Sequence, residues 1–129
     1  MLVFRYDKTF EGLLSALFDA YALHTFPDRL IGARDSEPLF TERVHEIATD
    51  AAHAARVWRG LGKRLRSRAR SMLVYAWHGE QEGSDELLLR CLRRIFDQDG
   101  GVVSDLADSD MKALHRLALQ VSHERERLK

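Results

Sequence analysis

The sequence predicts a mainly α-helical, single compact domain of about five helices with a small two-stranded antiparallel pair, residues 2–6 with residues 44–48. Three observations predict this fold. Apolar residues recur at spacings of three and four through most of the chain, as on the buried face of a helix. Only the stretches at 2–6 and 44–48 have strand composition, and the alternative is that 44–48 is loop and the domain is all-α. The length of 129 residues suits one core, and two prolines and eight glycines leave no room for a long linker.

The first helix follows the first strand directly. Thr9 is the predicted N-cap, because its hydroxyl oxygen can accept from an amide of the first turn. The helix is expected to end near His24, since Pro27 forces Phe26 out of the helical region of backbone space. Residues 28–43 are polar, contain one Gly and one Pro, and are predicted to be a surface loop before the second strand.

The segment from Thr49 to residue 78 predicts two helices. Thr49 is the expected N-cap of the first, in which Ala, Val, Trp and Leu share one face. This helix is expected to break near Leu65 to Ser67. Ser67 is then the predicted cap of the next helix, which ends before Gly79.

Two further helices complete the fold. "DELLLRCLRRIFDQ", residues 85–98, is the most regular amphipathic stretch, and the glycines of "DGG" are predicted to close it with a left-handed cap. The last helix is expected to begin near Asp108 or Ser109 and to turn an apolar row inward as far as Leu128.

A basic stretch, "ARVWRGLGKRLRSRAR" at residues 55–70, contrasts with a chain that has 20 basic and 20 acidic side chains. On one helix its cations would lie along one edge at spacings of three and four, with no acidic residue four positions away. Like charges at this spacing cost a few tenths of a kcal/mol each, and a bound polyanion would reverse that cost. The stretch is therefore predicted either to contact nucleic-acid phosphates or to be a solvated helix face. The predicted contact residues are Arg56, Arg59, Lys63, Arg66 and Arg70, extended by Arg90, Arg93 and Arg94. Trp58 and Trp77 are expected to be buried rather than to stack on bases.

No motif predicts catalysis, and no cofactor or metal is expected. No two of the six histidines are three, four or five residues apart, and the one Cys lies on an apolar face. The least improbable catalytic cluster is Tyr6, Asp7, Glu11 and Arg56. A structural ion pair is the preferred interpretation of that cluster, because a carboxylate beside Arg is a poor base at neutral pH.

The chain has no apolar run near the roughly 20 residues of a membrane span and no signal-peptide pattern. A single Cys excludes an internal disulfide. These features predict a cytoplasmic protein without membrane contact.

Four segments, in order, resemble a bacterial family of uncharacterised DNA-metabolism proteins. They are "FRYDKTFEGLLSALFDAY", "ATDAAHAARVWRGL", "LLLRCLRRIF" and "DLADSDMKALHRLALQVSHERERLK". Members of the family continue past the last segment, so the resemblance implies that residues 1–129 are either the N-terminal portion of a longer family protein or a naturally short version of it. One departure is Glu126, where the family usually has His.

The resemblance implies companions, namely a radical-SAM DNA modification or repair protein and a uracil-DNA-glycosylase-like domain. Together with the basic stretch it predicts a non-catalytic accessory domain of such a system that contacts DNA phosphates weakly and without sequence preference. The alternative is a module that docks the radical-SAM or glycosylase-like partner without touching nucleic acid. For docking, the candidate residues are the apolar side chains around the long loop, Phe26, Leu39 and Phe40.

Overall fold

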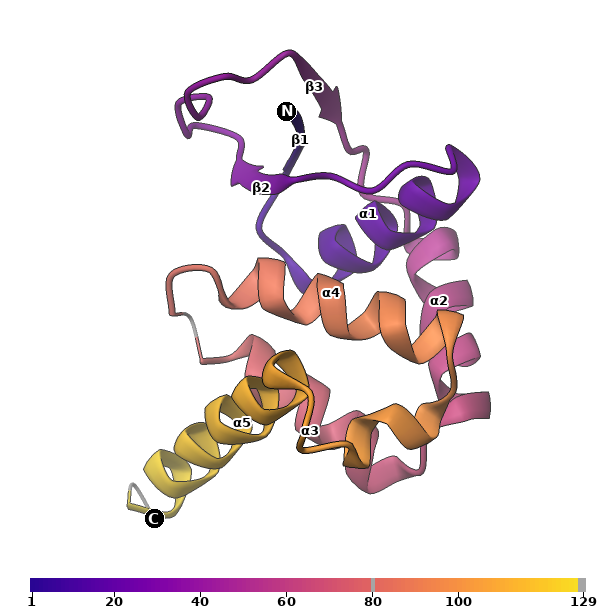
Figure 1. The fold of residues 1–129 in the computed structure, drawn as a ribbon, viewed down its shortest axis with the longest axis vertical. Helices are drawn as coiled ribbons and strands as arrows, with labels where there is room; N and C mark the ends of the chain where they lie inside the picture. Colours follow the sequence, from indigo (N-terminus) through magenta and orange to yellow (C-terminus); the bar gives the residue numbers. More distant parts are fainter. Residues whose placement is uncertain (80, 128–129) are drawn as a thin grey trace. The chain divides into compact units, whose positions relative to one another are not determined.

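A computed structural model describes residues 1–79 and 81–127 (Figure 1). Over these residues the chain forms five α-helices and three strands, so the mainly helical prediction is confirmed. Its contacts group into two compact units, Met1–Arg59 and Gly60–Lys129. The boundary falls inside helix α2 (Ala51–Arg64).

The sheet differs from the predicted antiparallel pair. It has three strands, β1 (Leu2–Tyr6), β2 (Arg29–Gly32) and β3 (Arg43–Glu46), in the order β2-β1-β3. Both pairings are parallel, with Phe4 of β1 opposite Leu30 on one side and His45 on the other. The prediction of an antiparallel pair is therefore wrong, as is the prediction of loop throughout residues 28–43.

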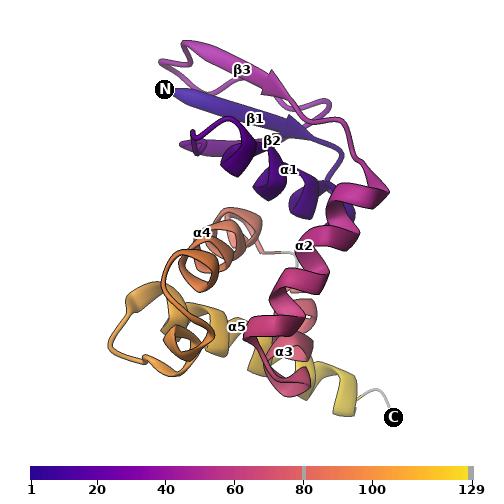
Figure 2. The same cartoon turned by 90° about the vertical axis from the view of Figure 1, so that its right-hand side faces the viewer.

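The connections explain the parallel arrangement. Helix α1 (Phe10–Ala22) follows β1 and carries the chain back along the sheet, so β2 runs in the same direction as β1. Figure 2 shows α1 lying along one face of the sheet. Val3 and Phe4 of the central strand are fully buried. The apolar residues of α1 at helical spacing are fully or almost fully buried as well, namely Leu13, Leu14, Ala16, Leu17 and Ala20.

The N-cap of α1 is the predicted residue, and the N-cap of α2 is not. Thr9 caps α1 as expected, and its hydroxyl oxygen accepts from the amide of Gly12 at 2.9 Å. Thr49 does not cap α2. Asp50 does, because its carboxylate accepts from the amides of Ala52 and His53 at 2.8 and 3.0 Å.

The second unit is helical. It contains α3 (Ser67–Trp77), α4 (Ser84–Asp97), the short 3₁₀ helix η1 (Gly100–Ser104) and α5 (Ser109–Arg127), and α3 packs against both α4 and α5. The predicted break is confirmed, since α2 ends at Arg64 and α3 begins at Ser67. Ser67 is the first helical residue and not the cap. The N-cap position is Arg66, whose extended backbone makes no side-chain capping bond. The core of this unit is formed by fully buried apolar side chains, Leu61, Leu73, Leu88, Leu92, Ile95, Met111 and Leu114.

The glycines after α4 do not form the predicted left-handed cap. Gly83 is the one described glycine with a positive φ, and Gly100 and Gly101 belong to η1. Gly100 is needed for a different reason: its backbone packs on the carbonyl group of Arg64, where a Cβ atom would overlap the oxygen. The start of α5 is as predicted, with Asp108 accepting from the first-turn amides. Leu128 lies outside the described residues.

Candidate functional site

Four cations of the basic stretch lie on α2, and three of them share one edge while Arg64 lies beside it. Arg56, Arg59 and Lys63 are spaced by three and four residues, so they follow one edge of this helix. All three side chains are exposed, and within the described part of the chain none forms an ion pair. We call these three residues the α2 cation row. Among the described residues no ion pair neutralises this row, so its charge is available to an anionic partner.

The rest of the predicted stripe does not continue this row in a straight line. Arg66 is exposed but sits at the break between the helices, where φ is −72° and ψ is 161°. Arg70 belongs to α3, is partly buried and is engaged by neighbouring groups. Arg68 is exposed and was missed by the prediction because it is out of phase with a single continuous helix.

The predicted extension on α4 is paired with carboxylates of α4 itself and of the start of α5. Arg90 pairs with Asp110 through two hydrogen bonds of 3.1 and 3.3 Å, and Arg93 approaches Asp97 to 3.5 Å. Arg94 pairs with Asp108, the cap of α5. A polyanion would have to displace these partners, whereas on the α2 cation row it would displace none within the described residues.

The two tryptophans are partly buried. Trp58 meets the ring of Phe10 edge-on, with centroids 5.9 Å apart. This contact is typical of aromatic packing in a core, so the structure favours a packing role for Trp58 over an open stacking platform.

The acidic cluster at the start of α1 is organised by hydroxyl groups and not by Arg56. Asp7 accepts from the hydroxyls of Thr9 and Thr49 at 2.6 and 2.7 Å, and from the Thr9 amide at 3.1 Å. Partial burial acts to raise the pKa of Asp7, but these hydrogen bonds outweigh it and hold the pKa below the ordinary 3.8. Tyr6 is only 2% exposed. Asp7 therefore holds the start of α1 to Thr49, and its lowered pKa makes it a poor base at neutral pH. Hydrogen bonds from the two threonines stand in place of the expected ion pair with Arg56.

The docking candidates separate into two kinds. Leu39 and Phe40 are adjacent and are 84% and 88% exposed. Phe40 has a φ of 66°, unusual for an aromatic residue. By contrast, Phe26 is partly buried and packs edge-on against Tyr21, with centroids 5.1 Å apart. Phe26 therefore belongs to the packing of its own unit.

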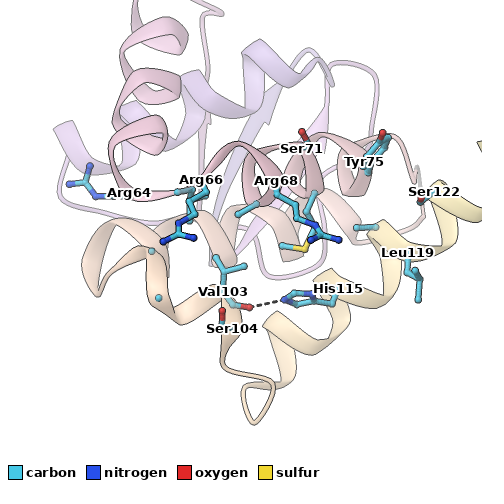
Figure 3. Close-up of a pocket in the computed structure, with 16 residues that line it drawn as sticks. Arg64, Arg66, Arg68, Ser71, Tyr75, Val103, Ser104, His115, Leu119 and Ser122 are labelled. Atoms are coloured by element: carbon cyan, nitrogen blue, oxygen red, sulfur yellow. Dashed lines mark hydrogen bonds between the residues drawn. The ribbon is translucent and has the colours of Figure 1, made fainter.

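A groove in the second unit was not foreseen. It lies between α3, η1 and α5, has a volume of about 730 Å³, and has an apolar floor (Figure 3). From the start of α3, Arg66 extends on the side of η1 and Arg68 on the side of His115, with their guanidinium groups apart, while Arg64 points away. The sequence carries the cations but no signal that α3 and α5 leave this space between them.

Among the described residues, no cluster of three or more His, Cys, Asp or Glu side chains is placed to hold a metal ion. No helix in the same ranges is both long enough and apolar enough to cross a membrane. Comparison with family models, curated proteins and solved structures finds no match to this chain.

Proposed function

We propose that this chain is a non-catalytic accessory domain that contacts the phosphates of nucleic acid through the α2 cation row. The observation that carries the proposal is the contrast in pairing. Arg5, Arg90, Arg93 and Arg94 each have a carboxylate partner, and the three cations of the α2 cation row have none in the described part of the chain. A row of like charges at helical spacing is mildly unfavourable in isolation and becomes favourable beside a polyanion.

The chemistry of the row suits backbone contact more than base reading. Helix α2 contains neither Asn nor Gln, the residues that pair with adenine edges. Long basic side chains along one edge can follow successive phosphates, which carry no sequence information. The expected binding is weak and without sequence preference. A role in DNA modification or repair, and a cytoplasmic location, follow from the family resemblance and the composition and are part of the same proposal.

The number of cations sets the expected salt dependence. Three neutralised phosphates on a duplex give a slope of about −2.7 in log affinity against log salt. Affinity should therefore fall roughly 40-fold between about 50 and about 200 mM salt. The measured slope would therefore distinguish contact by the three-cation row from contact by the larger surface of eight cations predicted from the sequence, which would give a steeper slope.

The test is a titration of fluorescently labelled duplex and single-stranded DNA at several salt concentrations. Arg59→Glu with Lys63→Glu should weaken binding and flatten the slope by about 2, since two of the three contacts are lost. The matched control is Lys112→Glu with Arg116→Glu, an exposed pair on α5 with the same spacing and the same change of charge. Absence of binding by the unmodified chain at about 20 mM salt, or an equal loss in the control, would refute the proposal.

A second candidate function is docking of the radical-SAM or glycosylase-like partner through Leu39 and Phe40. Its support is the pair of adjacent, highly exposed apolar side chains, which lie on a loop that hydrogen bonds fasten at Phe40 and Thr41. The carbonyl of Phe40 accepts from the amino group of Met1 at 3.1 Å, and the Thr41 hydroxyl donates to the carbonyl of Pro38 at 2.6 Å. Exposed neighbouring apolar groups on an ordered loop are typical of interaction surfaces.

This candidate predicts that Phe40→Asp abolishes co-purification with the partner. The Arg59→Glu, Lys63→Glu variant should retain it. Leu106→Asp is the control, because Leu106 is also exposed and lies in the other unit. Undiminished co-purification of Phe40→Asp would exclude this surface.

A further inference from the structure

The groove between α3, η1 and α5 has the size and composition of a ligand site. Its volume of about 730 Å³ lies within the range of small-molecule pockets. Sixteen residues line it, all of them from the second unit. Such pockets combine a mostly apolar surface with a few polar groups that fix the orientation of the ligand.

The charge of the lining has one sign. The charged side chains are Arg64, Arg66 and Arg68, and no Asp or Glu is among the sixteen lining residues. Arg64 is already engaged, because it donates to the Gly60 carbonyl at 3.0 Å and lies 4.6 Å from the ring centroid of Phe96. Arg66 and Arg68 are exposed and form no ion pair within the described ranges. These two guanidinium groups are therefore the ones available to an anion in the groove.

The floor of the groove is apolar. Met72 of α3, Val103 of η1 and Ala118 of α5 line it, and Leu119 beside them is 57% exposed. His115 does not add an open donor at its Nε2, which donates to the Val103 carbonyl at 2.7 Å (Figure 3). An apolar surface beside cations matches a molecule with an apolar body and an anionic group.

We propose that this groove binds a small organic anion, whose carboxylate, sulfonate or phosphate group pairs with the Arg66 or the Arg68 guanidinium and whose apolar body lies on Met72, Val103 and Leu119. Cations paired with an oxyanion form charge-assisted hydrogen bonds, which supply orientation as well as affinity. The site is separate from the α2 cation row, so it stands whether or not the chain binds nucleic acid.

The test uses two probes with the same aromatic body. Anilinonaphthalene sulfonate carries one anionic group, and N-phenylnaphthylamine lacks it; both become fluorescent in an apolar site. Titration of the full chain should give one site for the sulfonate, with affinity on the order of tenfold above that of the uncharged probe. Far-UV circular dichroism checks that every variant remains folded.

Two variant pairs separate the charged and apolar contributions. Arg66→Ala with Arg68→Ala should remove the preference for the sulfonate, while Lys112→Ala with Arg116→Ala should preserve it. Leu119→Asp should weaken both probes by about tenfold. Leu106→Asp is its matched control, because Leu106 is also 57% exposed in the same unit but does not line the groove.

Four results would overturn the proposal, three of which compare probes or variants. These three are equal affinity for the two probes, a preference for the sulfonate that survives the loss of both arginines, and equal effects of the Leu119 and Leu106 variants. Binding of many probe molecules per chain would indicate general exposure of apolar surface and would also overturn it.

Discussion

Adjacent glycines in η1 should respond in opposite directions to the same substitution. A Cβ at Gly100 would overlap the carbonyl oxygen of Arg64 and press on Leu65 at 3.2 Å, and a backbone carbonyl cannot rotate away as a flexible side chain can. Gly100→Ala is therefore expected near the upper end of overpacking costs, about 3 kcal/mol. A Cβ at Gly101 meets nothing within 4 Å, and the backbone there is not left-handed. Gly101→Ala should stabilise by about 0.5 kcal/mol, because it restricts the unfolded chain.

Urea denaturation followed by circular dichroism measures the difference. With a slope of about 1.5 kcal/mol per molar urea, Gly100→Ala should lower the unfolding midpoint by about 2 M, and Gly101→Ala should raise it slightly. Gly101→Ala serves as the control for helix propensity and unfolded-state entropy, which are the same for both positions. Midpoints that agree within about 0.3 M would show that the close approach of η1 to the end of α2 is not tight, and would refute the reasoning.

Three further changes test individual groups. Asp108→Ala should destabilise by about 1 to 2 kcal/mol, and Asp108→Asn by less, because the amide oxygen can still cap α5 while the pairing with Arg94 weakens; thermal unfolding compares the two. The pKa of Asp7 is lowered in the folded state, so its contribution is present above the ordinary value and is lost as pH falls through the folded pKa. Asp7→Asn should therefore flatten the decline of stability between about pH 5 and about pH 2, measured by urea unfolding. Burial raises the pKa of Cys91 to about 12, so iodoacetamide at about pH 8 should label this thiol in urea but not in the native chain, as mass spectrometry would show.

Local signals were sufficient for the first strand, the first helix and the helix break. Leu2–Tyr6 is strand as predicted, Thr9 caps α1, and the α2 helix ends where the basic stretch loses its apolar phase. Each depends on contacts within a few residues. The second strand was missed because it has four residues, of which only Leu30 and Ile31 are apolar, and its pairing depends on where α1 returns the chain.

The ion pairs of the α4 cations also show that local sequence signals predict only contacts between residues that are close in the chain. Asp97 is four residues after Arg93, so that pair was visible in the sequence. Asp110 is 20 residues from Arg90, and it meets that residue only because α5 folds back on α4. The groove is a tertiary feature in the same sense, since no stretch of sequence records the space left between two helices and a 3₁₀ turn.

The parallel sheet has a consequence for the order in which the first unit assembles. It contains no hairpin, so its earliest strand cannot pair with a neighbour made immediately afterwards. Val3 pairs with Arg29, which is made 26 residues later, and Leu2 pairs with Arg43, which is made 41 residues later. At about 5 to 20 residues per second of synthesis, the apolar stretch "LVF" stays unpaired for about 1 to 5 s until β2 is made, and β3 follows after about 2 to 8 s. During that interval, protection against aggregation must come from α1 packing early or from a chaperone, since the partner strands do not yet exist.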